Sequence, residues 1–229
     1  MRLKPTAKKL HLGCGPTAKT PEGWLNLDAS WNARLAKYPI LRKLLTVFRC
    51  LPHGLDNSWA ADIFIHDIRK PLPFEDNSFA GIYASHLLEH LYLDKAKALL
   101  KECYRVLEPR GVLRIVVPDL RVIINDYIKA TENNSEPAGE HLHPADKLSQ
   151  YFFIQYPSHN ILYELYAKLT DFHSHKWMYD AVSLCGYFNW AGFVEVQEMQ
   201  VQESRLTNLG QVEGPSTSGL VVEGIKPGG

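Results

Sequence analysis

A short apolar segment that stops at two glycines constrains the fold of this chain more than any other feature. Lys9-Leu10-His11-Leu12 leads into Gly13-Cys14-Gly15-Pro16, which predicts a buried strand that ends at a tight turn. Glycine adopts backbone conformations that are closed to residues with a Cβ atom, and it lets a ligand approach the main chain. In doubly wound α/β folds, such turns line the ligand site at the carboxyl edge of the sheet. The Gly-x-Gly pattern is too common to identify a nucleotide site by itself.

Strand-like and helix-like segments alternate along the rest of the chain. Further strands are predicted at residues 24–28, 61–68, 79–84, 112–117, 193–199 and 220–225, and helices at 94–107 and 176–191. This alternation indicates a mostly parallel sheet with right-handed crossovers. The last two strands are expected to pair in antiparallel fashion. We therefore predict an α/β fold, a doubly wound Rossmann-like sheet that is mostly parallel and ends in a C-terminal antiparallel hairpin.

Residues 121–175 do not follow this alternation. The segment is too long for a simple crossover, and it is rich in aromatic residues between positions 151 and 170. Aromatic residues at helical spacing usually form core, and they also line substrate pockets. We predict an inserted, mainly helical cap over the carboxyl edge of the sheet, within a single domain that spans residues 1–229.

Composition limits the partners and the location that we expect. Lys plus Arg and Asp plus Glu both number 25, so the formal net charge is zero and gives no reason to expect nucleic-acid binding. The four cysteines form no Cys-x-x-Cys pair, which favours a reducing compartment. No secretory signal and no apolar run long enough to cross a bilayer is evident. We therefore expect a cytoplasmic protein without a membrane span.

Residues 35–51 combine apolar and basic side chains at helical spacing. Such a helix either packs on the sheet with Lys and Arg outward or lies on a membrane surface. We favour packing on the sheet.

Nine short motifs follow one another along the chain, at residues 12–15, 23–28, 67–74, 77–79, 84–91, 105–111, 117–120, 191–193 and 220–224. In this order they resemble the motifs of the class I S-adenosylmethionine-dependent methyltransferases. More narrowly, the chain is similar to the small bacterial type 11-like predicted methyltransferases, which are often associated with sugar and polysaccharide pathways. The resemblance covers nearly all of the chain except the cap.

The resemblance implies S-adenosylmethionine as cofactor and a set of residues that bind it. Beneath the methionine part would lie Leu12, Gly13, Cys14 and Gly15, the ribose hydroxyls would meet Asp28, the adenine would meet Asp67 and Ile68, and the methionine end would face Ser85 and His86. Physical chemistry agrees, because glycines allow close approach and a carboxylate accepts hydrogen bonds from hydroxyl or amine donors.

The cluster His86-x-x-Glu89-His90 is the most informative candidate for chemistry. At this spacing the three side chains share one face of a helix. They could act as base and orienting group, as metal ligands, or as hydrogen-bonding groups that fix the turn after the strand. The pattern resembles the Glu-x-x-Glu-His motif of certain metal-assisted O-methyltransferases acting on quinone precursors and RNA 3′ ends. His86 replaces its first Glu, which argues against Mg²⁺, an ion that prefers oxygen ligands.

Two further histidine pairs lie at the ends of the cap, His141-x-His143 and His173-x-His175. Paired histidines could complete a metal site, although in polar loops they are usually surface residues. His175 precedes Lys176-Trp177-Met178-Tyr179, a stretch that recurs in the resembling family, and is the best candidate on the cap side for a general base. Cys14 is a weaker candidate for a nucleophile, because a small buried residue packed under the cofactor is the simpler interpretation.

The resemblance implies methyl transfer from S-adenosylmethionine to an oxygen, in preference to a nitrogen, of a small polar acceptor such as a sugar or glycan precursor. The predicted catalytic residues are His86, Glu89, His90 and His175. One alternative is a catalytically silent, methyltransferase-like binding module. A nicotinamide-dependent Rossmann enzyme is a poorer alternative, since Ala18 stands at the third glycine position of Gly-x-Gly-x-x-Gly and no helix is predicted to follow.

Overall fold

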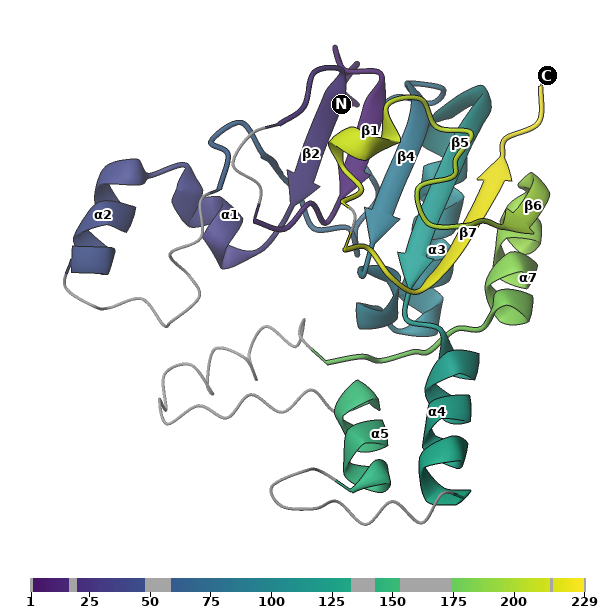
Figure 1. Cartoon of the computed structure of the whole chain (residues 1–229). Coiled ribbons are helices and arrows are strands. Elements are labelled where there is room, and N and C mark those ends of the chain that lie inside the picture. Colours follow the sequence, from purple (N-terminus) through teal and green to yellow (C-terminus); the bar gives the residue numbers. More distant parts are fainter. Residues whose placement is uncertain are drawn as a thin grey trace.

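A seven-stranded sheet forms the centre of the protein (Figure 1). The computed structural model describes residues 2–16, 20–47, 59–132, 143–152, 174–214 and 216–228. Its strands are β1 (Lys9–Leu12), β2 (Trp24–Asp28), β3 (Phe64–Ile65), β4 (Phe79–Ser85), β5 (Leu107–Val117), β6 (Val194–Glu198) and β7 (Leu220–Ile225). Its helices are α1 (Trp31–Ala36), α2 (Pro39–Val47), α3 (Leu93–Val106), α4 (Leu120–Glu132), α5 (Pro144–Phe152) and α7 (Ala181–Ala191), with short 3₁₀ turns η1 (Leu88–His90) and η2 (Leu209–Gln211).

The strand order is β3-β2-β1-β4-β5-β7-β6. The first five strands in this order are parallel, whereas β7 runs antiparallel to both β5 and β6. The chain winds outward from β1 in one direction to β2 and in the other to β4, so the order reverses next to β1. At such a reversal the carboxyl ends of the strands form a ligand site in open α/β sheets. The predicted fold class, including the C-terminal antiparallel pairing, is confirmed.

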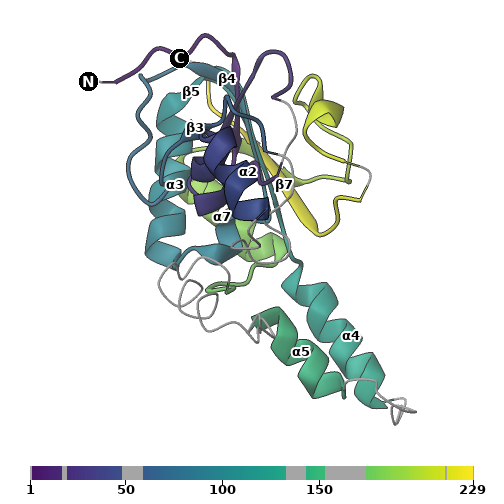
Figure 2. The same ribbon diagram turned by 90° about the vertical axis from the view of Figure 1, so that its left-hand side faces the viewer.

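The two faces of the sheet are covered in different ways (Figure 2). Helices α3 and α7 cover one face and contribute to the larger hydrophobic core. Helix α3 buries the stripe Ala96, Leu99, Leu100, Cys103 and Val106, the spacing expected of an amphipathic helix on a sheet. The opposite face is covered by the irregular segment between β6 and β7, whose Leu206 and Leu209 pack with Trp24 and Tyr83 of the sheet.

Helix α7 begins later than the sequence predicts. We expect a helix from residue 176, whereas α7 begins at Ala181 with Asp180 as its N-cap. The Asp180 carboxylate accepts from the Ser183 backbone N–H at 2.8 Å, and the Ser183 hydroxyl pairs with the Asp180 N–H at 3.1 Å. This capping box fixes the start of the helix. The preceding residues 174–180 are therefore extended, and they cross the carboxyl ends of β4 and β5, where Asp119 and Tyr179 form an isolated bridge.

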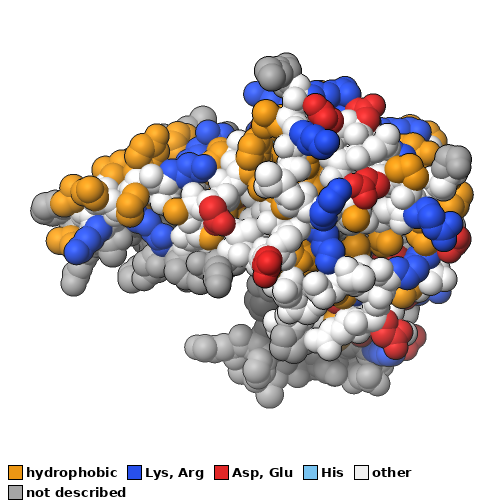
Figure 3. Space-filling view, turned by 90° about the horizontal axis from the view of Figure 1, so that it is seen from above, with side chains coloured by type: hydrophobic (Ala, Val, Ile, Leu, Met, Phe, Trp, Pro, Cys, Tyr) orange, Lys and Arg blue, Asp and Glu red, His pale blue; other side chains and the backbone are white. Residues whose placement is uncertain are grey.

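The prediction that residues 35–51 pack on the sheet is wrong for the residues described, which end at Val47. Pro39 has no N–H to donate, so it cannot continue α1 and instead begins α2. This second helix projects away from the sheet, and Ile40 is 78% and Val47 is 67% exposed. Figure 3 shows hydrophobic and basic side chains side by side over this lobe of the molecule.

Helices α4 and α5 lie beyond the carboxyl ends of the central strands (Figure 1), where the sequence predicts a cap. His141, His173 and most of the aromatic stretch fall outside the described residues. The division into one domain with a cap at residues 121–175 stays a prediction. In the described part of the chain, no helix has the length and apolar character needed to cross a bilayer.

Candidate functional site

The glycine turn after β1 has the geometry that only glycine adopts easily. Gly13 and Gly15 both have a left-handed backbone, with φ of 62° and 61°. The Gly13 N–H donates to the Leu27 carbonyl at 2.8 Å, which holds the turn against the end of β2. A Cβ atom on Gly13 would lie 2.6 Å from Leu87 Cδ1, whereas one on Gly15 would meet none of the described residues within 4 Å. Gly13 is therefore needed for packing, and Gly15 borders open space.

Asp28 ties this turn to the next strand. It ends β2, and its carboxylate accepts hydrogen bonds from the backbone N–H groups of Gly15, at 3.2 Å, and Ser30, at 2.7 Å. The two N–H groups bind different carboxylate oxygens, and a carboxylate can accept about four hydrogen bonds in total. Asp28 thus keeps acceptor capacity for a bound hydroxyl while it orders the turn.

The other predicted adenine and methionine residues are more enclosed. Arg69 forms a fork on the carboxylate of Asp67, with Nε–Oδ1 and Nη2–Oδ2 distances of 2.9 and 2.8 Å. This pairing lowers the pKa of Asp67. Ile68 and Leu12 are buried in the main core. Burial raises the pKa of the Cys14 thiol to about 12, which favours the thiol over the nucleophilic thiolate.

Ser85 ends β4, and His86 turns the chain away from the sheet. His86 has a φ of 48°, and its N–H donates to the Val116 carbonyl at 2.9 Å. Its Nε2 lies 3.1 Å from the Ser218 carbonyl oxygen, and its Nδ1 lies 3.3 Å from Glu89 Oε1. The contact with Glu89 raises the pKa of His86. Because both ring nitrogens face oxygen acceptors, His86 is suited to the protonated state rather than to the role of a base.

Glu89 is fully buried in η1, and neither of its carboxylate oxygens has a partner with hydrogen-bond geometry among the described residues. The 3.3 Å contact with His86 is therefore an ion pair without a well-formed hydrogen bond. A buried carboxylate without a hydrogen bond is rare in protein interiors.

His90 and His175 meet beside Glu89, although they lie far apart in the sequence. Their ring centroids are 5.0 Å apart, and one ring nitrogen of each lies within 4.8 Å of the other and of a Glu89 oxygen. The backbone N–H groups of Lys176 and Trp177 donate to the Glu89 carbonyl at 2.7 and 3.2 Å, which brings the extended segment 174–180 against η1. Burial lowers the pKa of His90, so its ring is neutral. The structure thus brings together all four predicted catalytic residues.

A family model described as a methyltransferase domain matches residues 10–115 of this chain, a little under half of its length. The matched segment contains the glycine turn, Asp28 and the cluster that follows β4. This match supports a class I S-adenosylmethionine-dependent methyltransferase domain in this part of the chain. The family-level resemblance in the sequence is confirmed, whereas the acceptor stays a prediction.

Solved structures of methyltransferases align with this chain at low sequence identity. The DszA carbon methyltransferase is 11% identical with a TM-score of 0.48, and the match covers 100% of this chain and 49% of that one. PigF with S-adenosylhomocysteine is 14% identical with a TM-score of 0.45, covering 96% and 50%. A Haloferax volcanii complex of the Trm112 methyltransferase activator and a putative methyltransferase is 14% identical with a TM-score of 0.46, and the match covers 100% of this chain and 86% of that one. The chain spans about half the length of the first structures it matches. No curated protein matches its sequence.

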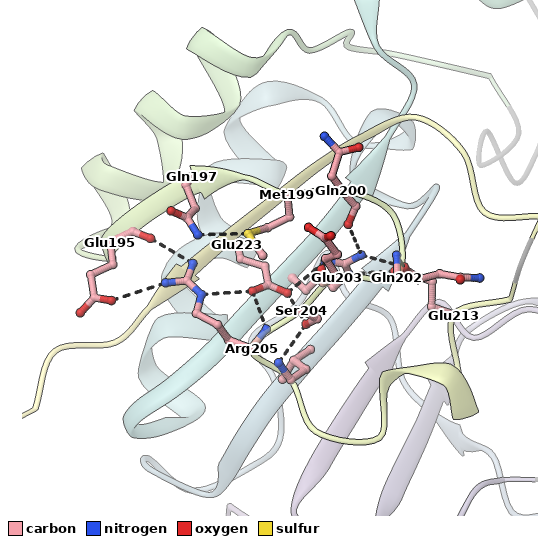
Figure 4. A network of polar contacts seen from close by, with 12 residues as sticks. Glu195, Gln197, Met199, Gln200, Gln202, Glu203, Ser204, Arg205, Glu213 and Glu223 are labelled. Atoms are coloured by element: carbon pink, nitrogen blue, oxygen red, sulfur yellow. Dashed lines mark hydrogen bonds and ion pairs between the residues drawn. The ribbon is translucent and has the colours of Figure 1, made fainter.

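The structure also contains a buried ion network that sequence reasoning missed. Arg114 in the middle of β5 is fully buried and forms a two-pronged contact with Glu213, with Nε–Oε2 and Nη2–Oε1 distances of 2.8 and 2.7 Å. Its Nη1 donates to Glu223 Oε1 at 3.0 Å. Figure 4 shows how backbone and side-chain groups of residues 200–205 complete the contacts of both glutamates. The available signals were a single Arg within an apolar predicted strand, Glu213 between the last two predicted strands, and Glu223 within the last one.

Proposed function

We propose that this protein transfers a methyl group from S-adenosylmethionine to a hydroxyl oxygen of a small polar acceptor, such as a sugar or a glycan precursor. The observation that carries the proposal is the methyltransferase-domain match over residues 10–115. The segment includes a glycine turn whose backbone is open at Gly15 and anchored by Asp28.

The residues at this turn fit the cofactor. The open space at Gly15 would accommodate a group lying against the main chain, and Asp28 retains acceptor positions for ribose hydroxyls. Asp67 is a weaker candidate for direct contact, because Arg69 already occupies both of its oxygens. Its pairing would instead shape the exit of β3 near the adenine.

The cofactor supplies an electrophilic methyl group on a sulfonium, so the protein chiefly has to position the acceptor in line and exclude water. As the oxygen–methyl bond forms, the sulfur–methyl bond breaks and the hydroxyl proton must leave. His90 and His175 are the candidates to accept that proton. Each has its Nδ1 beside a backbone carbonyl, of Ser174 and Tyr151 respectively, which leaves the second ring nitrogen as an acceptor. His86 would support the site as a cation beside Glu89.

A small acceptor is favoured over a nucleic acid because the formal net charge is zero. An oxygen is favoured over an amine because a hydroxyl must lose its proton during the reaction. The pair of imidazoles beside the domain's methyltransferase motifs supplies groups of that kind.

Calorimetry with S-adenosylhomocysteine tests the cofactor assignment. We expect wild-type protein to bind, and Asp28→Asn to bind at least about tenfold more weakly, since two ribose hydrogen bonds to a charged acceptor are weakened. Asp76→Asn is the matched control, because Asp76 is an exposed acid near the amino end of β4, and it should bind as wild type does. Absence of wild-type binding would overturn the proposal, and unchanged binding by Asp28→Asn would overturn the role of Asp28.

The acceptor class is tested by measuring S-adenosylhomocysteine release with panels of sugars, other alcohols and amines of matched size. Turnover confined to hydroxyl compounds is the expected result. Turnover with amines alone would refute the oxygen assignment, and cofactor binding without turnover across both panels would favour the silent binding module.

A further inference from the structure

The fully buried carboxylate of Glu89 has a single ion-pair partner among the described residues, the half-exposed His86. Its exposed fraction is 0%, and neither oxygen has a hydrogen-bond partner among those residues. Burying an ionised carboxylate without compensation costs several kcal/mol. His86 offsets part of this cost, but its side chain is 46% exposed and its Nδ1 is 3.3 Å away. A positive charge that fits directly against the oxygens would compensate Glu89 more completely.

The two histidine rings beside Glu89 are oriented as metal ligands usually are. The Nδ1 of His90 lies 3.3 Å from the Ser174 carbonyl oxygen, and the Nδ1 of His175 is hydrogen-bonded to the Tyr151 carbonyl oxygen. We assign the proton of each ring to Nδ1, because a carbonyl can only accept. The second nitrogen then carries a lone pair. Metal-binding histidines characteristically donate their other N–H to a backbone carbonyl or a carboxylate in this way.

The three ligand atoms are also close enough to share an ion. One carboxylate oxygen of Glu89 and one ring nitrogen from each histidine lie within 4.8 Å of one another. Ligands at about 2.0–2.2 Å from a zinc ion are separated by less than this, so small side-chain adjustments would close the set.

We propose that Glu89, His90 and His175 bind a divalent transition-metal ion of the zinc class. Two imidazoles and one carboxylate match the donor set of zinc sites with three protein ligands, which keep a fourth position for water or substrate. Mg²⁺ is disfavoured, because it prefers an all-oxygen octahedral shell. This site goes beyond the general-base role described above, and the two roles exclude each other at a given histidine while an ion is bound.

An open coordination position would let the ion bind the methyl acceptor. This role of the ion rests on the proposed function. An acceptor hydroxyl bound there would become more acidic, as water bound to zinc does. Metal binding itself does not depend on that step, so it is measured without any methyl acceptor.

The test uses the full chain with any affinity tag removed. The protein is stripped with a chelator and titrated with Zn²⁺ alone and with Co²⁺ alone, followed by elemental analysis after gel filtration and by the visible absorption of Co²⁺. We expect one ion per chain in wild type, a tetrahedral or five-coordinate Co²⁺ spectrum, and affinity weakened by more than about tenfold in Glu89→Gln and His175→Gln. His66→Gln is the matched control, since His66 lies after β3 and contacts the Pro71 carbonyl, and it should bind as wild type does.

Binding of S-adenosylhomocysteine is measured on the same samples and separates the possible failures. A wild-type protein that binds S-adenosylhomocysteine but retains no Zn²⁺ or Co²⁺ would overturn the metal site and leave the proposed function standing. Metal that remains on His175→Gln with wild-type affinity would also overturn it. Metal bound without S-adenosylhomocysteine would support the site and count against the proposed cofactor. Retained S-adenosylhomocysteine binding by Glu89→Gln would show that its loss of metal is not a loss of fold.

Discussion

The Arg114 network and the Glu89 cluster both contain fully buried charges, but they differ in how those charges are hydrogen-bonded. Arg114, Glu213 and Glu223 have fully buried side chains, and so does Glu89 beside His90 and His175. In the first cluster the guanidinium donates to both glutamates and to the carbonyl oxygens of residues 200 and 203. In the second, neither carboxylate oxygen has a hydrogen bond among the described residues.

The difference separates a structural role from a functional one. The Arg114 cluster lies between β5, β7 and the segment that covers the second face of the sheet, so it joins that segment to the sheet (Figure 4). Its groups satisfy one another and leave little capacity for a ligand. The Glu89 cluster lies where β4 ends, at the edge where ligands bind in this class of sheet. Unpaired capacity at that edge is available to bind an ion or a substrate.

Breaking the Arg114 cluster should have the largest effect on stability. Arg114→Met leaves two buried carboxylates without their common partner and should lower the free energy of unfolding by about 3–5 kcal/mol. Urea unfolding followed by circular dichroism measures the change. Lys8→Met is the control, because it breaks an ion pair with Glu108 in which the Lys8 side chain is 71% exposed, and should cost at most about 1 kcal/mol. A cost below that value for Arg114→Met would contradict the structural role of the cluster.

His11 provides a comparison outside both clusters. It is 8% exposed between the rings of Trp24 and Tyr83, and burial lowers its pKa to about 4. In the unfolded chain, His11 has a pKa of about 6.5. Between pH 6.5 and pH 4 it is therefore protonated in the unfolded chain but neutral in the folded protein. The contribution of His11 is therefore complete above pH 6.5 and is lost as the pH falls toward 4.

His11→Phe should remove this pH dependence. Between pH 7.5 and pH 5, wild type should lose about 2 kcal/mol more of its free energy of unfolding than the variant loses. Denaturant titrations at the two pH values provide the measurement, with His66→Gln as a control in a more exposed position. Equal losses in wild type and His11→Phe would show that His11 is not held neutral by burial.

The contrast between the clusters also shows how much the sequence could predict. The glycine turn and Asp28 were predictable because each follows directly from its own strand, and parallel strands bring their carboxyl ends together. The Arg114 network was not, because Glu213 and the carbonyl groups that complete it come from a segment without periodicity that folds back over the sheet. The exposure of α2 was missed for a related reason, since an amphipathic pattern predicts an apolar face but not what covers it.

His175 stands between these cases. Its proximity to His90 depends on the extended segment before α7, and the sequence instead predicts a helix from residue 176. The Asp180 and Ser183 capping box was a readable signal for the later helix start. The two backbone hydrogen bonds to the Glu89 carbonyl could not be predicted, because main-chain contacts between distant segments do not depend on which residue types are present.

The smallest expected effect on stability is that of Glu89→Gln, and comparing it with Glu213→Gln tests the difference between the two clusters directly. Glu213→Gln weakens charge-assisted hydrogen bonds from Arg114 and should lower the free energy of unfolding by about 1.5–3 kcal/mol. Glu89→Gln instead removes a buried charge that, among the described residues, has no hydrogen bond and only the half-exposed His86 as an ion-pair partner, so metal-free protein should change by no more than about 0.5 kcal/mol or become more stable. Urea unfolding of both variants in the presence of a chelator makes the comparison. A loss from Glu89→Gln equal to that from Glu213→Gln would mean that Glu89 is as structural as Glu213, and that its unpaired oxygens are no sign of a ligand.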